Sequence, residues 1–486
     1  MSHTRSNDSS QSINRARSKV RLGSIKVVAT LLSTVLLIGA SIIGVAYKFV
    51  NDIGTSVSSN HSTSKIASTR ASLLNARRLP TILSTEIRIG GLIRSLSDTV
   101  QIMPDQSCLV VSVEGQQITS INPNLPVIPA SNMKLLTATA ALEVLGPEFV
   151  FTTKVVGLSQ ANQIVGDLWL VGGGDPLLST IGYPATESYP TMHPTNIGLL
   201  IDAFVATGIT EITGNIVGDE SRYDTERFTP TLGLGVRTTE VGPLGALMLN
   251  DGVVLSSPVK PDQPALSAAE EFLRLLTERG IVVRGAAKIG TASTDLPVVA
   301  SISSAPLSDV VSEMLTNSDN NTAELMLKEI GLARLSSGTR IAGAQVVQSV
   351  LQEFGLPIDG LVIIDGSGLD RGNRATCALF TSILERDGGF GLLGSGLAIA
   401  GQTGTLRDLL GETTAGERLH AKTGTLTGAK ALSGYVAYAP EKSATFALIL
   451  NGSGVSNQGA YRPLWNGLAN ALGALTEHPS VADIAP

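Results

Sequence analysis

Residues 131–145 read Ser-Asn-Met-Lys-Leu-Leu-Thr-Ala-Thr-Ala-Ala-Leu-Glu-Val-Leu and are followed by a Gly-Pro pair. Apolar residues recur in this stretch at helical spacing, and the Gly-Pro pair is a stop signal, so the pattern predicts a helix that ends there. Ser131 and Lys134 stand three residues apart at its start and therefore share a face. A lysine whose pKa is lowered by its surroundings can take the proton of a serine. The helix start thus presents a candidate nucleophile with a candidate base.

The Ser-x-x-Lys spacing is weak evidence by itself, because Ser62 and Lys65 repeat it where no helix is expected. A second motif, Ser318-Asp-Asn320, lies in a polar turn before a helix that we expect over residues 322–335. Its serine and asparagine suit a proton relay and the binding of a substrate amide. The alternative is a simple helix cap, since Ser, Asp and Asn are favoured N-cap residues.

A third motif, Lys422-Thr423-Gly424-Thr425, follows a strand expected over residues 417–421. A cation beside a hydroxyl can hold a substrate carboxylate, and glycine lets a peptide approach the backbone closely. The alternative is an ordinary exposed strand end. The three motifs together indicate nucleophilic serine chemistry far more strongly than any one of them does.

Other catalytic classes find little support in the sequence. Of five histidines, only His193 and His420 fall in the expected folded body, and no His-Glu-x-x-His, Gly-x-Ser-x-Gly or phosphate-loop motif is present. We therefore expect neither a metal nor a cofactor. The net charge is −6, and the chain is acidic beyond its basic start, which argues against nucleic acid as a partner.

The two cysteines, Cys108 and Cys377, are too few for a disulfide framework. Neither has a second cysteine or a histidine close enough in the sequence to suggest a metal site. We expect both to be buried as small apolar side chains.

The N-terminal region has the pattern of a membrane anchor. Residues 1–26 hold six basic residues and one acidic residue, and residues 27–47 carry no charge. As a helix, residues 27–47 would be about 31 Å long, enough to cross a hydrocarbon core of ~30 Å. The basic flank predicts a cytoplasmic N terminus and an extracytoplasmic remainder. A cleaved secretory signal is the main alternative, and a buried core helix is another.

Composition and periodicity divide the rest of the chain. A stretch rich in Ser, Thr and Asn predicts a stalk, and short strands that alternate with helices predict an inserted domain. The expected parts are a cytoplasmic tail (1–26), a transmembrane anchor (27–47), a stalk (48–84), the first part of the main domain (85–148), an inserted domain (149–300), the second part of the main domain (301–476) and a tail (477–486).

Within the main domain we expect mostly antiparallel strands. Alternation around Glu114-Gly115 predicts a hairpin over residues 107–119, and tight turns between the last strands favour antiparallel pairing. The other expected elements are strands over 361–364, 431–439 and 444–451 and helices over 307–315, 340–354 and 464–476.

The ordered Ser-x-x-Lys, Ser-x-Asn and Lys-Thr-Gly motifs resemble the signature of penicillin-interacting serine enzymes. Their context resembles the D-Ala-D-Ala carboxypeptidase/endopeptidase family of class C penicillin-binding proteins over roughly residues 85–475. The matching stretches are 129–142, Gly166-Asp-Leu-Trp-Leu-Val-Gly-Gly-Gly-Asp-Pro-Leu177, Gly214-Asn-Ile-Val-Gly-Asp219, Asp365-Gly-Ser-Gly-Leu-Asp-Arg371 and His420-Ala-Lys-Thr-Gly-Thr-Leu426.

The resemblance implies an α/β (α+β) fold with a transpeptidase domain of the β-lactamase type. In that fold a five-stranded antiparallel sheet is flanked by helices and interrupted by an inserted mixed α/β domain. Family members often carry two inserted domains, and the gap between Ser131 and Ser318 looks too short for both, so we expect one complete and one reduced or missing. The family segment that contacts the stem-peptide side chain has no clear match in residues 227–240, which leaves that preference open.

The resemblance also implies an activity: hydrolysis of peptidoglycan stem peptides by a serine-type D-Ala-D-Ala carboxypeptidase, with DD-endopeptidase action open as well. The acyl-enzyme would form at Ser131, and β-lactams would act as covalent inhibitors. Lys134 would be the base, Ser318 the proton relay and Asn320 the group that binds the substrate amide.

The remaining site residues would bind the substrate. Lys422 and Thr423 would hold the terminal carboxylate, Gly424 would admit the peptide, and Thr425 would share the oxyanion site with the nucleophile's own N–H. Arg371 either helps line the peptide site or is a surface arginine. The rival hypotheses are a related serine β-lactamase or esterase and a non-catalytic cell-wall-binding protein with the same fold.

Overall fold

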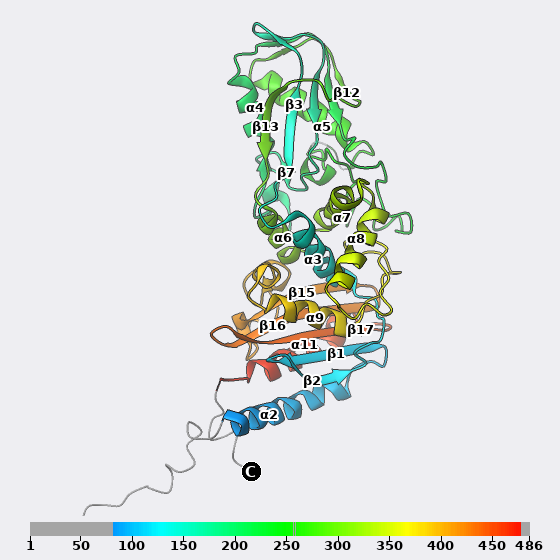
Figure 1. Ribbon diagram of the computed structural model, residues 1–486, viewed down its shortest axis with the longest axis vertical. Coiled ribbons are helices and arrows are strands. Elements are labelled where there is room, and N and C mark those ends of the chain that lie inside the picture. Colours follow the sequence, from blue (N-terminus) through cyan, green and yellow to red (C-terminus); the bar gives the residue numbers. More distant parts are fainter. Residues whose placement is uncertain (1–80, 256, 258, 478–486) are drawn as a thin grey trace, which may run out of the picture. The chain divides into compact units, whose positions relative to one another are not determined.

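The computed structural model describes residues 81–255, 257 and 259–477 (Figure 1). The expected cytoplasmic tail and anchor, most of the stalk and nearly all of the C-terminal tail therefore lie outside the described residues. Within the described part of the chain, no helix has the length and apolar character that a membrane span requires. The first described element is helix α2 (Thr81–Gln101), so residues 81–84 of the expected stalk are helical.

An antiparallel sheet of six strands forms one layer of the main domain (Figure 1). Its order is β14 (Ala398–Ile399), β15 (Leu419–Leu426), β16 (Ala429–Ala439), β17 (Lys442–Asn451), β1 (Ser107–Val113) and β2 (Gln116–Ile121). Strand β14 has only two residues, so the five longer strands agree with the five-stranded antiparallel sheet that we expected. The N-terminal hairpin is also confirmed, and it joins the C-terminal strands because β1 pairs with β17.

Both faces of this sheet are buried, which explains why β1 reads as a nearly continuous apolar run. Cys108 and Val110 point into a core with helix α9 (Cys377–Asp387), whereas Leu109 and Val111 point into a core with α2 and α11 (Gln458–Gly473). The sheet therefore lies between two helical layers.

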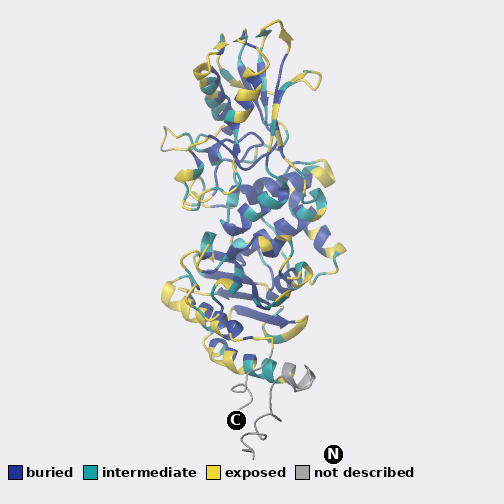
Figure 2. Ribbon diagram, turned by 90° about the vertical axis from the view of Figure 1, so that its left-hand side faces the viewer, coloured by how far each residue is buried: buried dark blue, intermediate teal, exposed yellow. Residues whose placement is uncertain are grey.

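The helix that contains the Ser-x-x-Lys motif is central to the main domain. A 3-10 turn (Ala130–Asn132) leads into α3 (Met133–Leu145), which packs against α6 (Leu307–Thr316), α7 (Asn320–Leu335) and α8 (Arg340–Glu353). Its first nine residues are buried on every side rather than along one apolar stripe. Figure 2 shows that the packed helices of the described chain are mostly buried. Small Ala and Thr side chains let the neighbouring helices approach from several directions.

The described residues between α3 and α6 form three further sheets. A mixed five-stranded sheet has the order β12-β10-β6-β3-β13, a four-stranded sheet has the order β11-β9-β5-β4, and β7 pairs with β8 in a third. The elements are β3 (Thr152–Val156), β4 (Ser159–Gln160), β5 (Gln163–Ile164), β6 (Leu168–Val171), β7 (Leu178–Ser179), β8 (Thr195–Asn196), α4 (Ile197–Val205), β9 (Glu211–Ile212), β10 (Ile216–Asp219), α5 (Pro264–Glu278), β11 (Val282–Val283), β12 (Ala287–Ile289) and β13 (Val298–Ser303). The division into one complete and one reduced inserted domain stays a prediction.

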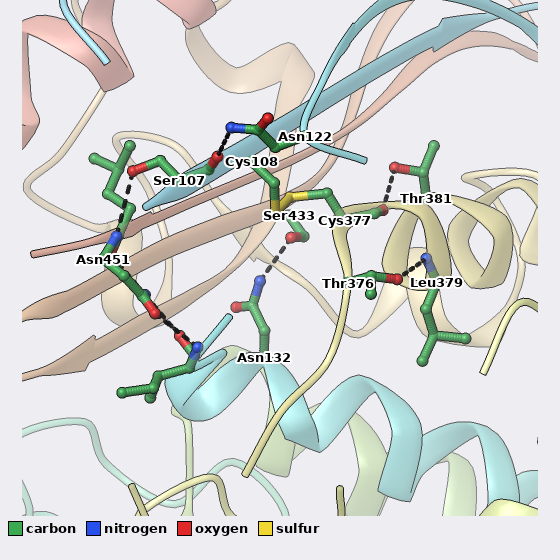
Figure 3. The surroundings of a disulfide bond; sticks show 12 residues. Ser107, Cys108, Asn122, Asn132, Thr376, Cys377, Leu379, Thr381, Ser433 and Asn451 are labelled. Atoms are coloured by element: carbon green, nitrogen blue, oxygen red, sulfur yellow. Dashed lines mark hydrogen bonds between the residues drawn. A yellow bond between two sulfur atoms is a disulfide. The ribbon is translucent and has the colours of Figure 1, made fainter. Parts of the chain in front are cut away.

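Cys108 and Cys377 are buried as expected, but the expectation that they act only as small apolar side chains is wrong. Cys108 and Cys377 form a disulfide across 269 residues of sequence, with their Cα atoms 5.9 Å apart (Figure 3). The fold brings β1 against the start of α9, a proximity that the sequence separation concealed. The strand expected over residues 361–364 is also absent, since only an isolated bridge from Val362 to Arg374 forms there.

Candidate active site

The candidate nucleophile and base lie together at the start of α3. Lys134 Nζ lies 3.2 Å from Ser131 Oγ and donates hydrogen bonds of 2.7 Å to Asn320 Oδ1 and to the carbonyl oxygen of Ser367. The lysine side chain has no exposed surface, whereas Ser131 is partly exposed. The amine is therefore held by two fixed acceptors beside an accessible hydroxyl.

The environment of Lys134 makes its neutral form accessible near neutral pH. Burial lowers its pKa from 10.5 to about 8, against the opposing charges of Asp319, Asp365, Glu324 and Glu240. Desolvation disfavours the ammonium form, and the carboxylates favour it. Lys134 thus meets the electrostatic condition for a general base.

The Ser-x-Asn motif serves as a helix cap and also belongs to the cleft. The Asp319 side chain caps α7 by accepting hydrogen bonds from the backbone N–H of Thr322 and from its hydroxyl. Asn320 accepts from Lys134 and donates to the carbonyl oxygen of Glu240 at 2.7 Å. Ser318 lines the same cleft as the nucleophile, but within the described residues its hydroxyl makes no hydrogen bond to Ser131 or Lys134.

The Lys-Thr-Gly motif lies inside β15, not at an exposed strand end. Lys422 is fully buried, and its pKa is lowered well below 10.5 by desolvation and by the charge of Lys134. The Thr423 hydroxyl donates to that of Thr405 at 2.8 Å. A Cβ at Gly424 would lie 3.0 Å from the carbonyl oxygen of Pro129, so glycine allows the strand to approach the turn that carries Ser131.

A side-chain contact fastens this turn to the sheet. Asn132 Nδ2 donates a 2.6 Å hydrogen bond to Ser433 Oγ on β16 (Figure 3). The residue after Ser131 is therefore tied to the strand that pairs with the Lys-Thr-Gly strand.

The three motifs meet at one cleft with a volume of about 430 Å³. Of the predicted site residues, the cleft is lined by Ser131, Ser318, Asn320, Thr423, Gly424 and Thr425. Lys134 and Lys422 are buried and do not line it. Arg371 is exposed, donates to the carbonyl oxygen of Thr427 and is not part of the cleft lining.

The inserted segment supplies cleft residues that the sequence analysis missed. The Tyr183 hydroxyl lies 3.2 Å from a Glu187 oxygen and 3.1 Å from an Asp251 oxygen, and Lys260 also lines the cleft. Desolvation raises the pKa of Asp251 to about 6. These residues come from loops far apart in the sequence and form no motif, so no spacing signal could have grouped them.

The sheet, the helix start and this cleft define a serine hydrolase of the penicillin-interacting class. The profile of the D-Ala-D-Ala carboxypeptidase 3 (S13) family matches residues 95–263 and 255–470, and the chain belongs to this family. It is a hydrolase of the D-Ala-D-Ala carboxypeptidase type.

Individual relatives agree with this assignment. The chain is 28% identical over 428 residues to a D-alanyl-D-alanine carboxypeptidase of Actinomadura sp. (strain R39), covering 71% of this chain and 77% of that protein. It is 30% identical over 368 residues to carboxypeptidase DacB of Mycolicibacterium smegmatis, with 71% and 76% coverage.

Solved structures agree in fold. Penicillin binding protein 4 (dacB) from Haemophilus influenzae matches with a TM-score of 0.65 and 21% identity, covering 78% of this chain and 98% of that one. A structure of the same protein complexed with a β-lactam matches with a TM-score of 0.60 and 20% identity, at the same coverage. The mixed α/β fold is therefore shared with a penicillin-binding protein.

Proposed function

We propose that this enzyme removes the terminal D-Ala from peptidoglycan stem peptides through an acyl-enzyme on Ser131. The observation that carries the proposal is the 3.2 Å contact between the buried Lys134 amine and the Ser131 hydroxyl at the edge of the cleft. A base must lie within hydrogen-bond reach of the proton that it removes, and this pair meets that condition.

Acylation begins with neutral Lys134, which accepts the Ser131 proton while Oγ attacks the carbonyl carbon of the penultimate D-Ala. The backbone N–H groups of Ser131 and Thr425 stabilise the oxyanion, and one such donor contributes on the order of 3 kcal/mol. The C–N bond then breaks, and the leaving amine takes a proton that Ser318 relays from Lys134. Water hydrolyses the ester, which frees the shortened peptide and restores the serine.

The substrate is held by the other two motifs. Thr423, which lines the cleft, and the buried Lys422 bind the terminal carboxylate, and DD-endopeptidase action stays open. Asn320 binds a substrate amide. Its side-chain nitrogen, which donates a hydrogen bond to the Glu240 carbonyl oxygen, donates instead to a carbonyl oxygen of the bound peptide. Arg371 is proposed to contact the substrate at the rim of the cleft. To do so, its side chain must release the carbonyl oxygen of Thr427, to which it donates a hydrogen bond.

β-Lactams acylate the same serine in this proposal. Their ring-opened product stays attached to Ser131 and cannot leave as an amine does, so the acyl-enzyme persists. The complex of the Haemophilus influenzae protein with a β-lactam supports this binding class.

The test uses the purified extracytoplasmic part and its Ser131→Ala variant. The wild-type chain should be labelled by a fluorescent penicillin and should release D-Ala from a D-Ala-D-Ala peptide, and the variant should do neither. Labelling of the variant would show that Ser131 is not the nucleophile. Faster turnover of a cephalosporin than of the peptide would favour the β-lactamase alternative, and absence of turnover on either would favour a binding protein.

For localisation we propose a single-pass anchor over residues 27–47 with the catalytic part outside the cytoplasm, or a secreted protein if the segment is cleaved. The Cys108–Cys377 disulfide supports an oxidising compartment, since such bonds seldom persist in the cytosol. A protease that does not cross membranes should digest the catalytic part when it is added to intact cells. Protection of the catalytic part until the cells are lysed would contradict the proposal.

A further inference from the structure

The Asp365–Asp370 turn lies against the start of α3, where it contacts the Lys134 amine and the backbone at Ala130 and Ser131. The carbonyl oxygen of Ser367 accepts the 2.7 Å hydrogen bond from Lys134 Nζ, and that of Gly366 accepts one of 2.9 Å from Thr137 on the same helix. Gly368 packs against the carbonyl of Ala130, immediately before the nucleophile. The position of this turn therefore sets where the amine lies.

Two buried carboxyl groups hold the turn in place. Asp365 accepts the backbone N–H groups of Gly368 at 2.8 Å and Asp370 at 2.7 Å, so it shapes the turn from within. Glu324, on α7, accepts the backbone N–H of Ser367 at 2.8 Å and is only 3% exposed. Glu324 thus connects a neighbouring helix to the residue whose carbonyl binds Lys134.

We propose that Glu324 is a positioning residue for the general base: its carboxylate fixes Ser367 by the N–H, and the carbonyl of Ser367 fixes Lys134. This inference rests on the proposed function of Lys134. Glu324 touches neither the substrate nor the reacting atoms, and it acts only through the turn and through its charge.

The charge of Glu324 adds a second effect. The charged groups that act on Lys134 are Asp319 at the start of α7, Asp365 in the turn, Glu324 on α7 and Glu240 in the inserted segment. The Lys422 amine on β15, whose own pKa Lys134 lowers, faces them. Burial raises the pKa of Glu324 to about 7, so its carboxylate forms above that pH and there favours the ammonium form of Lys134. Loss of that charge should make the base neutral at lower pH.

The experiment compares Glu324→Gln with Glu324→Ala by rates of fluorescent-penicillin labelling between pH 6 and 10. Glutamine keeps an acceptor for Ser367 but carries no charge, whereas alanine removes both. The matched control is Glu329, also on α7 and 2% exposed, which binds Arg222 and Tyr223 instead of the turn. Thermal unfolding of each variant measures the loss of folded protein.

We expect E324Q to keep the wild-type rate at high pH but to reach half of it at a pH lower by on the order of one unit. E324A should lose about tenfold or more at every pH, because the Ser367 carbonyl, one of the acceptors that fix the amine, is held less firmly. E329Q and E329A should keep the wild-type pH midpoint whatever their stability.

Wild-type rates at every pH in E324A, or an unchanged pH midpoint in E324Q, would overturn the proposal. Equal losses in E324A and E329A after correction for folded protein would also overturn it. Labelling that persists in S131A, or no labelling of the wild-type chain, would instead reject the proposed function and the positioning role with it.

Discussion

The carbonyl oxygen of Ala130 lies 1.9 Å from the point that a Cβ on residue 368 would occupy. Gly368 also has a φ of 85°, a conformation that residues with a side chain rarely adopt. The backbone before Ser131, the proposed nucleophile, and the turn that binds Lys134 are thus in direct contact, and only glycine permits that contact.

Gly368→Ala should displace the turn from Ala130 and lower the rate of labelling by a fluorescent penicillin at least tenfold, because a shift of about 1 Å can cost much of a catalytic rate. The control is Gly355→Ala, whose φ is 68° but whose Cβ would meet nothing within 4 Å. That variant should lose about 1 kcal/mol of stability and keep its labelling rate. Equal labelling of the two variants would show that the contact is unimportant.

The labelling rate of the wild-type chain should rise with pH through about 8, the pKa to which burial lowers Lys134, because only the neutral amine accepts a proton. Lys134→Ala should lower the rate by about 100-fold or more and remove this rise. Stopped-flow or gel-based labelling between pH 6 and 10 measures both effects. A flat wild-type profile would argue against Lys134 as the base.

Replacement of both Cys108 and Cys377 by alanine should lower the free energy of unfolding by about 3–5 kcal/mol, because the disulfide closes a very long loop in the unfolded chain. Urea unfolding measures this loss, and reduction of the wild-type chain should reproduce it. Labelling per folded molecule should not change. An unchanged urea midpoint would mean that the bond contributes no stability.

Stability should fall as pH rises from 5 to 8. Desolvation raises the pKa of Asp175 to about 6 and those of Glu313 and Glu324 to about 7. Between the unfolded and folded pKa values the folded state binds more protons, so a rise in pH through this window disfavours folding. The free energy of unfolding measured with urea should be more than about 1 kcal/mol lower at pH 8 than at pH 5. Asp175→Asn should reduce this difference. A rise in stability over this range would contradict the prediction.

Much of the fold and of the candidate site could be predicted from short-range patterns in the sequence. The Ser-x-x-Lys pair is adjacent because a helix places residues three apart on one face, and the N-terminal hairpin follows from two strand-forming runs on either side of the tight Glu114-Gly115 turn. The strand predicted over residues 417–421 lies too far toward the N terminus. Pairing with β16 extends β15 to Leu426, through the Lys-Thr-Gly motif. Pairing partners, not local propensity, decide where such a strand ends.

The amino-acid sequence alone determined the chemistry: a hydroxyl, an amine, an amide and a second amine in three spaced motifs, which local geometry and residue type are enough to define. Only the tertiary structure decided that Lys134 loses its water and so its high pKa, that Cys108 meets Cys377, and that Glu324 and Asp251 come near the cleft. Burial and long-range contact depend on how distant segments pack, and no spacing along a chain encodes them directly.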